Sequence, residues 1–270
     1  MAMEKRKELI EKLHNALELE RKTVGIRFLD TEEDFQNSTA QELLHKLPYC
    51  VMIKAGTKGH PIKIKPDNMG CFAAARALGM TEVTESYLSG EDYMGFDIFD
   101  NQEASKKVVD GISIIDREVY GVEISPLEKM DQDPDVVIQV STPYNIMRLI
   151  QGYNYYYGTY SNYRMGGLQA ICSESTAYPY MSDDINVSMM CAGTRYMAQW
   201  KREELALSMP YSKFEATING LLKTIDPLER DGDKERIEKN YKDKNLEDLN
   251  LHYGQNYDTD YYEIGEKGLR

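Results

Sequence analysis

Two separate stretches of the chain repeat one arrangement of residues, and together they hold all four cysteines of the protein. The first stretch runs from Cys50 to Cys71 and the second from Cys172 to Cys191. In each, the first cysteine is followed by a helix-like and then a β-like segment, and the second cysteine leads into another helix-like segment. Such a repeat restricts the possible folds, because equivalent sequence segments are expected to occupy equivalent places.

The similarity extends beyond these two stretches. Apolar, β-branched residues at 23–29 and 136–141 predict one strand ahead of each cysteine-containing stretch. The alternation of strands and helices favours an α/β or α+β fold. We therefore expect one compact domain over 1–225, built from two similar halves, about 1–110 and 111–225, that are related by a pseudo-twofold axis.

Helix signals stand out at three further places. Apolar residues at helical spacing predict an amphipathic helix over 3–22, and a shorter helix is expected over 39–47, closed by Pro48. A third helix is expected to begin at Pro143 and to end at Gly158, since proline suits the first turn and glycine the end of a helix.

The composition changes after residue 226. The segment 226–270 is charged and rich in tyrosine but poor in Leu, Ile and Val, so it cannot form a core of its own. It is expected to be either a solvated tail or an extension that packs on the body or on a second copy, which would make the protein a homo-oligomer.

Charge and hydropathy exclude several classes of protein. The net charge of −13 argues against nucleic-acid binding, which depends on Lys and Arg. No apolar run is long enough to span a membrane, and the first residues do not resemble a signal peptide. These features predict a cytoplasmic protein. Because thiols stay reduced there, four cysteines suggest metal binding or redox chemistry before structural disulfides.

The cysteines form the first candidate site. Cys71 and Cys191 each precede a predicted helix, and Cys50 and Cys172 are expected in the first turn of one. Unpaired N–H groups at a helix start favour the thiolate, which is the form that binds metals. We therefore expect these four residues to hold an iron–sulfur cluster for redox chemistry, electron transfer or sensing. Zinc is an alternative, although close zinc knuckles are absent, and so is simple packing of buried thiols.

The segment PLEKMDQDPDVVIQVSTPYNIMRLIQGYNY resembles the central signature of the DUF169 family. The two cysteine patterns also resemble that family, and PYMSDDINVSMMCAGTR is their most specific part. The similarity covers roughly residues 5–225. It implies one compact, prokaryotic, cytosolic protein with the tail as an addition. Because the family is largely uncharacterised, the resemblance implies no catalytic residues.

A tyrosine-rich segment provides the second candidate site. It includes Tyr156, Tyr157 and Tyr163 and leads into Arg164-Met165-Gly166-Gly167, where the glycines permit close approach of the backbone. Such a segment can wall a planar ligand such as a tetrapyrrole or flavin. Arg76 and Arg195 follow the helix-start cysteines and suit an anionic group. The alternative function is therefore a binding module for a planar, anionic small molecule. For each arginine alone, a structural ion pair is the simpler interpretation.

A third possibility is an enzyme that uses one cysteine, such as Cys191, as its nucleophile. No histidine stands near a cysteine or serine in a way that identifies a general base. The partner expected from the sequence is accordingly a small molecule or a redox partner protein.

Overall fold

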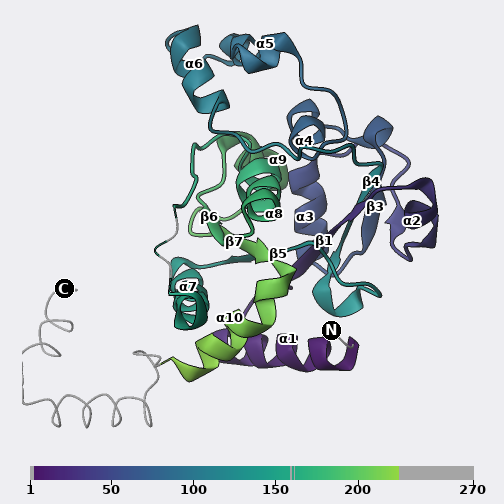
Figure 1. Ribbon diagram of the computed structural model, residues 1–270, viewed down its shortest axis with the longest axis vertical. Helices are drawn as coiled ribbons and strands as arrows, with labels where there is room; N and C mark the ends of the chain where they lie inside the picture. The colour runs from purple at the N-terminus through teal and green to yellow at the C-terminus, as the bar shows by residue number, and fades with distance from the viewer. Residues whose placement is uncertain (1–2, 159, 161, 225–270) are drawn as a thin grey trace, which may run out of the picture. The chain divides into compact units, whose positions relative to one another are not determined.

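The computed structural model describes residues 3–158, 160 and 162–224, and the chain up to Lys223 forms one compact unit (Figure 1). Its centre is a seven-stranded sheet with the order β2-β3-β4-β1-β5-β7-β6. The strands are β1 (Val24–Leu29), β2 (Gln41–Glu42), β3 (Ile62–Ile64), β4 (Gly121–Pro126), β5 (Val136–Ser141), β6 (Asn186–Ser188) and β7 (Leu205–Pro210).

Helices of several kinds connect the strands. The α-helices are α1 (Met3–Leu17), α2 (Glu32–Asn37), α3 (Tyr49–Thr57), α4 (Phe72–Ala77), α5 (Glu85–Leu88), α6 (Gln102–Val109), α7 (Pro143–Tyr157), α8 (Tyr178–Ser182), α9 (Ala192–Ala198) and α10 (Tyr211–Lys223). Three short 3₁₀ helices are η1 (Pro66–Asn68), η2 (Glu91–Phe96) and η3 (Leu127–Lys129), and η4 (Ala170–Ala177) is a π-helix.

The sheet is mixed, with mainly antiparallel pairing. Only β2 and β3 run parallel among the paired strands of the described chain, and β1 and β5 form the central antiparallel pair. The predicted mixture of helices and one sheet is therefore confirmed. The two cysteine stretches lie in corresponding positions, between β1 and β4 and between β5 and β7. A pseudo-twofold relation between whole halves stays a prediction.

Alternate side chains of the central strands point to opposite faces of the sheet and enter two apolar clusters. Val136 and Ile138 belong to one cluster, together with residues of α3, α4, α9 and the π-helix. Val137 belongs to the other, together with residues of α1, α7 and α10. We call these the α3 face and the α7 face; Figure 1 shows α1, α7 and α10 on the side away from α3 and α4. This alternation follows from the period of two in a strand.

On the α7 face, two long helices touch through glycine. A Cβ atom added to Gly220 of α10 would lie 2.1 Å from the carbonyl oxygen of Gly152 in α7. A Cβ atom added to Gly152 would lie 2.4 Å from the oxygen of Thr217. Because neither backbone can move away without moving its helix, only glycine allows this close packing.

Most local predictions agree with the structure. The strands expected at 23–29 and 136–141 are β1 and β5, and the third helix is α7, which begins at Pro143 and ends before Gly158 with φ of 58°. The first helix stops at Leu17, earlier than expected. No helix in the described part of the chain is long and apolar enough to cross a bilayer.

The helix expected over 39–47 is wrong. Residues Gln41–Glu42 form β2, which pairs with β3, and Leu43 N–H donates to the oxygen of Lys63 at 3.0 Å. Pro48 does not close a helix but precedes α3 as its N-cap. The backbone N–H and C=O groups of this segment can bond either within a helix or to a neighbouring strand, but not to both. Here they bond to β3, which lies later in the chain, so the local helix preference is not realised. The predicted extension 226–270 lies outside the described residues.

Candidate functional site

The four cysteines lie on four different elements around the α3 face. Cys50 is in the first turn of α3, and Cys172 is in the π-helix; both are buried. Cys71 and Cys191 are the N-caps of α4 and α9 and are partly exposed. Their positions at helix starts were therefore predicted correctly. All four belong to, or pack against, the same apolar cluster.

The predicted iron–sulfur cluster is wrong. Among the described residues, no three His, Cys, Asp or Glu side chains form a group that could hold a metal ion. The cysteines therefore do not form a ligand set, and the same finding counts against zinc at this position. The sequence placed each thiol at the start of a helix, but it did not determine the distances between four separate elements.

The two buried thiols are also unsuited to attack a substrate. Burial raises the pKa of Cys50 to about 11, and repulsion from Cys71 and Cys191 adds to this shift. Burial also raises the pKa of Cys172 well above the usual value for a thiol. Both thiols thus stay protonated near neutral pH, whereas the thiolate is the reactive form. A nucleophilic role of Cys191 stays a prediction.

The two arginines proposed from the sequence are bound within the fold. Arg195 donates to three backbone oxygens, those of Lys201, Met189 and Glu204, at 2.6–2.9 Å. Its guanidinium thereby holds the turn before β7. Nη1 of Arg76 lies 2.7 Å from a carboxylate oxygen of Asp92. Arg76 thus forms the ion pair that the simpler interpretation expected, whereas the partners of Arg195 are backbone oxygens.

The three proposed tyrosines have different surroundings in the structure. Tyr156 is exposed, and its hydroxyl accepts from Nζ of Lys223 at 2.7 Å. Tyr157 packs against Tyr153 with ring centroids 4.6 Å apart. Tyr163 packs against the cluster of the α7 face. Their role as ligand-binding residues, and the tetrapyrrole alternative, stay predictions.

The π-helix is the unusual element of the α3 face. A π-helix is rare and is found frequently at functional sites. All eight of its residues are buried, including the polar run from Ser173 to Thr176. Its sequence, AICSESTA, has no helical alternation of polar and apolar residues, so periodicity could not identify it. A short run that is polar and yet fully buried needs partners from other segments.

Those partners come from three parts of the chain. Ser173 pairs with Ser113, accepting from its N–H at 2.9 Å and donating to its oxygen at 3.0 Å. The carboxylate of Glu174 accepts from the N–H groups of Gly166 and Gly167 at 2.7 and 3.2 Å, and from the hydroxyl of Ser188. These bonds hold the segments 111–113 and 164–168 beside the π-helix.

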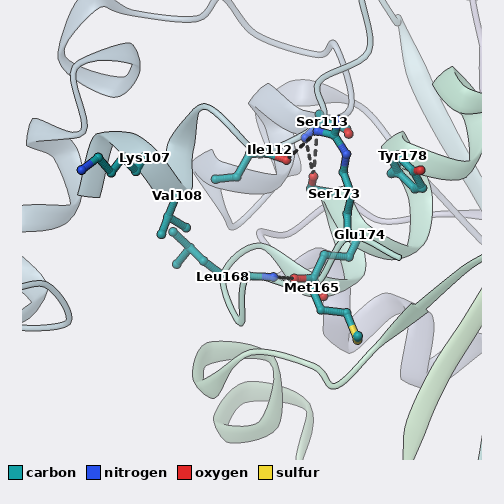
Figure 2. Close-up of a pocket in the computed structure, with 12 residues that line it drawn as sticks. Lys107, Val108, Ile112, Ser113, Met165, Leu168, Ser173, Glu174 and Tyr178 are labelled. Carbon is teal, nitrogen blue, oxygen red and sulfur yellow. Dashed lines mark hydrogen bonds between the residues drawn. The ribbon is translucent and has the colours of Figure 1, made fainter. Parts of the chain in front are cut away.

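Between these segments lies a cavity of about 380 Å³ (Figure 2). Much of its wall is apolar: in Figure 2, Val108 and Leu168 lie on one side of the view and Tyr178 on the other. The residues that line the cavity are Lys107, Val108, Gly111, Ile112, Ser113, Arg164, Met165, Gly166, Leu168, Ser173, Glu174 and Tyr178. Its size is within the range of small-molecule sites. We call it the π-helix cavity.

The carboxyl group of Glu174 lies in the wall of this cavity and is almost completely buried. Burial raises its pKa above the ordinary value of 4.5, and the hydrogen bonds from Ser188, Gly166 and Gly167 partly offset this effect. The hydrogen bonds of Glu174 hold the wall of the cavity together. Because the carboxyl group is buried, its ionised form is less favourable than that of an exposed carboxyl group.

A second cavity, of about 590 Å³, is lined by acidic residues near the start of α10. Three of its carboxylates are already neutralised by ion pairs, at 2.5–3.2 Å. These pairs are Arg6 with Asp133, Lys213 with Asp183, and Lys5 with Glu215. The acidic residues therefore give this second cavity little net charge with which to bind a cation.

Sequence reasoning found part of the π-helix cavity and missed the rest. It singled out the segment Arg164-Met165-Gly166-Gly167, whose first three residues line the cavity, but only as the end of a tyrosine-rich stretch. It did not find Glu174 or Ser173, because their signal is burial of polar groups, which depends on the tertiary structure.

Comparison with known proteins agrees with the resemblance seen in the sequence. The profile of the family DUF169, described as "Uncharacterised ArCR, COG2043", matches residues 12–220. An uncharacterised protein of Methanocaldococcus jannaschii is 25% identical over 217 residues, which cover 80% of this chain and 93% of that protein. No solved structure matches the chain. By the extent of the profile match, the chain belongs to the DUF169 family.

Proposed function

We propose that this protein binds a small molecule with an apolar body in the π-helix cavity. The observation that supports the proposal is a cavity with mainly apolar walls whose polar groups bond to one another. The pair of Ser173 with Ser113 and the bonds from Gly166 and Gly167 to Glu174 fasten the walls without closing the space between them. A preformed space of this kind reduces the free energy that binding must spend on ordering the site.

The surroundings of the cavity favour a binding role over a catalytic one. Its polar groups Ser173 and Glu174 accept and donate within the protein, so neither is positioned as a free nucleophile or base. The partner of the protein under this proposal is the small molecule itself. A cytoplasmic location, as predicted from the sequence, gives access to small metabolites.

Gly166 allows a direct test by filling the cavity. A Cβ atom added there would meet only Val108, at 3.5 Å, among the surrounding atoms within 4 Å, and the backbone is not in the left-handed region. The variant Gly166→Leu should therefore keep the fold and the N–H donor to Glu174 while its side chain occupies the cavity. The control is Gly95→Leu, at an exposed glycine with no atom within 4 Å of an added Cβ.

Binding is measured by ligand-observed NMR with a set of one-ring and two-ring aromatic fragments that includes indole-3-acetamide. We expect the unaltered protein and Gly95→Leu to bind fragments with dissociation constants of about 1 mM or below. Gly166→Leu should lose at least about tenfold in affinity. Equal binding by Gly166→Leu would show that the fragments bind elsewhere, and no binding by the unaltered protein would refute the proposal.

A further inference from the structure

Among the charged residues that line the π-helix cavity, Arg164 differs in its partners. Lys107 is paired with Glu103 at 2.7 Å, and Figure 2 shows its side chain extending away from the other lining side chains. The guanidinium of Arg164 makes one hydrogen bond within the described chain, from Nη1 to the oxygen of Gly111 at 3.3 Å. It also lies 5.4 Å from the ring centre of Tyr178. No carboxylate of the described residues pairs with it.

Several other arginines of the described chain have a carboxylate partner, which Arg164 lacks. Arg21, Arg27, Arg76 and Arg117 each form an ion pair with an Asp or Glu side chain. A guanidinium has five N–H donors in a planar fork, which suits the two oxygens of a carboxylate. Arg164 thus keeps most of its donors available at the edge of a cavity with apolar walls.

The backbone of Arg164 is fixed from the sheet. Asn186 of β6 is completely buried, and its side-chain oxygen accepts from the N–H of Arg164 at 2.9 Å. Its side-chain nitrogen donates to the oxygen of Arg164 at 3.0 Å and to the oxygen of Glu174 at 2.7 Å. One buried amide therefore connects the arginine to the π-helix. The hydrogen bonds from Asn186 thus hold the backbone of Arg164 in place before a ligand binds.

Glu174, the acidic residue that lines the cavity, does not form an ion pair with Arg164. The carboxylate of Glu174 already accepts from Gly166, Gly167 and Ser188, and these bonds use most of its acceptor positions. Its negative charge is thus spread over donors of the protein itself. The cavity thus has the guanidinium of Arg164 with free donors at its edge and apolar surface within.

We infer that the ligand of the π-helix cavity is an organic acid, whose carboxylate or similar anionic group binds Arg164 while its apolar body fills the cavity. Asn186 acts as a positioning residue, because it holds the backbone of Arg164 and does not itself line the cavity. This inference rests on the proposed function and adds to it the chemical class of the ligand.

The test compares two probes of the same shape, indole-3-acetate, which is an anion, and indole-3-acetamide, which is neutral. We expect the unaltered protein to bind the acid about tenfold more tightly than the amide, as for a charge-assisted pair. Arg164→Gln should bind both probes equally. Arg202→Gln, at an exposed arginine outside the lining residues, is the matched control and should keep the preference.

Asn186→Ala tests the positioning role through the same ratio. If Asn186 had a purely structural role, Asn186→Ala would reduce the affinity for both probes equally. If Asn186 positions Arg164, the affinity for the acid should fall more than the affinity for the amide. If the unaltered protein does not prefer the acid, or if Arg164→Gln keeps the preference, the inference is wrong. Because Gly166→Leu tests occupation of the cavity independently of charge, failure of the anion assignment can be distinguished from failure of the proposed function.

Discussion

The two faces of the sheet are built in different ways. On the α7 face, three regular helices pack mainly through long apolar side chains and the direct contact between Gly152 and Gly220, although Arg6 and Arg148 are buried there as well. On the α3 face, the helices are short, one of them is a π-helix, and buried polar groups such as Glu174 and Asn186 lie beneath the surface. The only cysteines of the protein and the π-helix cavity are on this second face.

This difference indicates a division of roles. Close packing of regular helices stabilises the fold but leaves no space for a ligand. Irregular backbone with buried polar partners stabilises the protein less per residue, because each polar group must first lose its water. It can, however, place an arginine beside an open cavity. We therefore expect the stability of the protein to be most sensitive to side-chain volume on the α7 face. On the α3 face we expect it to depend more on the buried polar and titratable groups.

The largest effect is expected from Gly220→Ala on the α7 face. The added Cβ atom would lie 2.1 Å from the oxygen of Gly152, so α7 and α10 must separate. We expect the free energy of unfolding to fall by about 3 kcal/mol, as for severe overpacking. Urea unfolding followed by circular dichroism measures the change.

Gly193→Ala in α9 on the α3 face is the matched control. An added Cβ there meets only the end of Met197, at 3.7 Å. Gly193 is the second residue of α9, where the preference for alanine over glycine is weaker than inside a helix. Gly193→Ala should therefore not lower the free energy of unfolding and should raise it by at most about 1 kcal/mol. Similar effects at both positions would show that the glycine contact does not distinguish the two faces.

The second prediction concerns the thiols of the α3 face. Because burial raises the pKa of Cys50 to about 11, very little of it is thiolate near neutral pH. We expect iodoacetamide at pH 7.5 to modify Cys50 about 100-fold more slowly in the folded protein than in urea. Cys172 should be protected as well, since burial also raises its pKa. Mass spectrometry of peptides gives the rate at each cysteine.

Cys71 and Cys191 provide the internal control, because both are partly exposed and cap helices. Their thiols should react with iodoacetamide well before Cys50 and Cys172 do. Rapid modification of Cys50 in the folded protein would mean that the apolar cluster opens, or that its thiol is not held in the protonated form.

The smallest effect is expected for the pH dependence of stability at Glu174. Burial raises the pKa of this carboxyl group in the folded protein above 4.5, so the folded state binds its proton more tightly than the unfolded state. Its contribution to stability is therefore present below pH 4.5 and is lost as the pH rises through the folded-state pKa. Glu174→Gln should remove this part of the pH dependence.

The measurement is the free energy of unfolding of both proteins across that range of pH. The free energy of unfolding of Glu174→Gln should still decrease somewhat as the pH rises, because burial also raises the pKa of Asp135. Glu82→Gln, at an exposed carboxylate, serves as the control and should leave the profile unchanged. An identical profile for Glu174→Gln would show that the carboxyl group does not change its protonation on unfolding in this range.

The sequence by itself determined those features that neighbouring residues encode. Apolar runs identified β1 and β5, Pro143 and Gly158 gave the ends of α7, and each helix-start cysteine was placed correctly. Membership of the DUF169 family was also evident from local motifs. These signals depend on periodicity, capping and turn chemistry, which act over a few residues.

Only the tertiary structure decided which distant groups meet. It gave residues 41–42 to a strand, formed no metal-binding group from the cysteines among the described residues, and paired Arg76 with Asp92. It also placed Asn186 beneath Arg164 and buried the polar π-helix. The physical reason is that such contacts join segments far apart in the chain, so their distances follow from the packing of whole elements on the sheet.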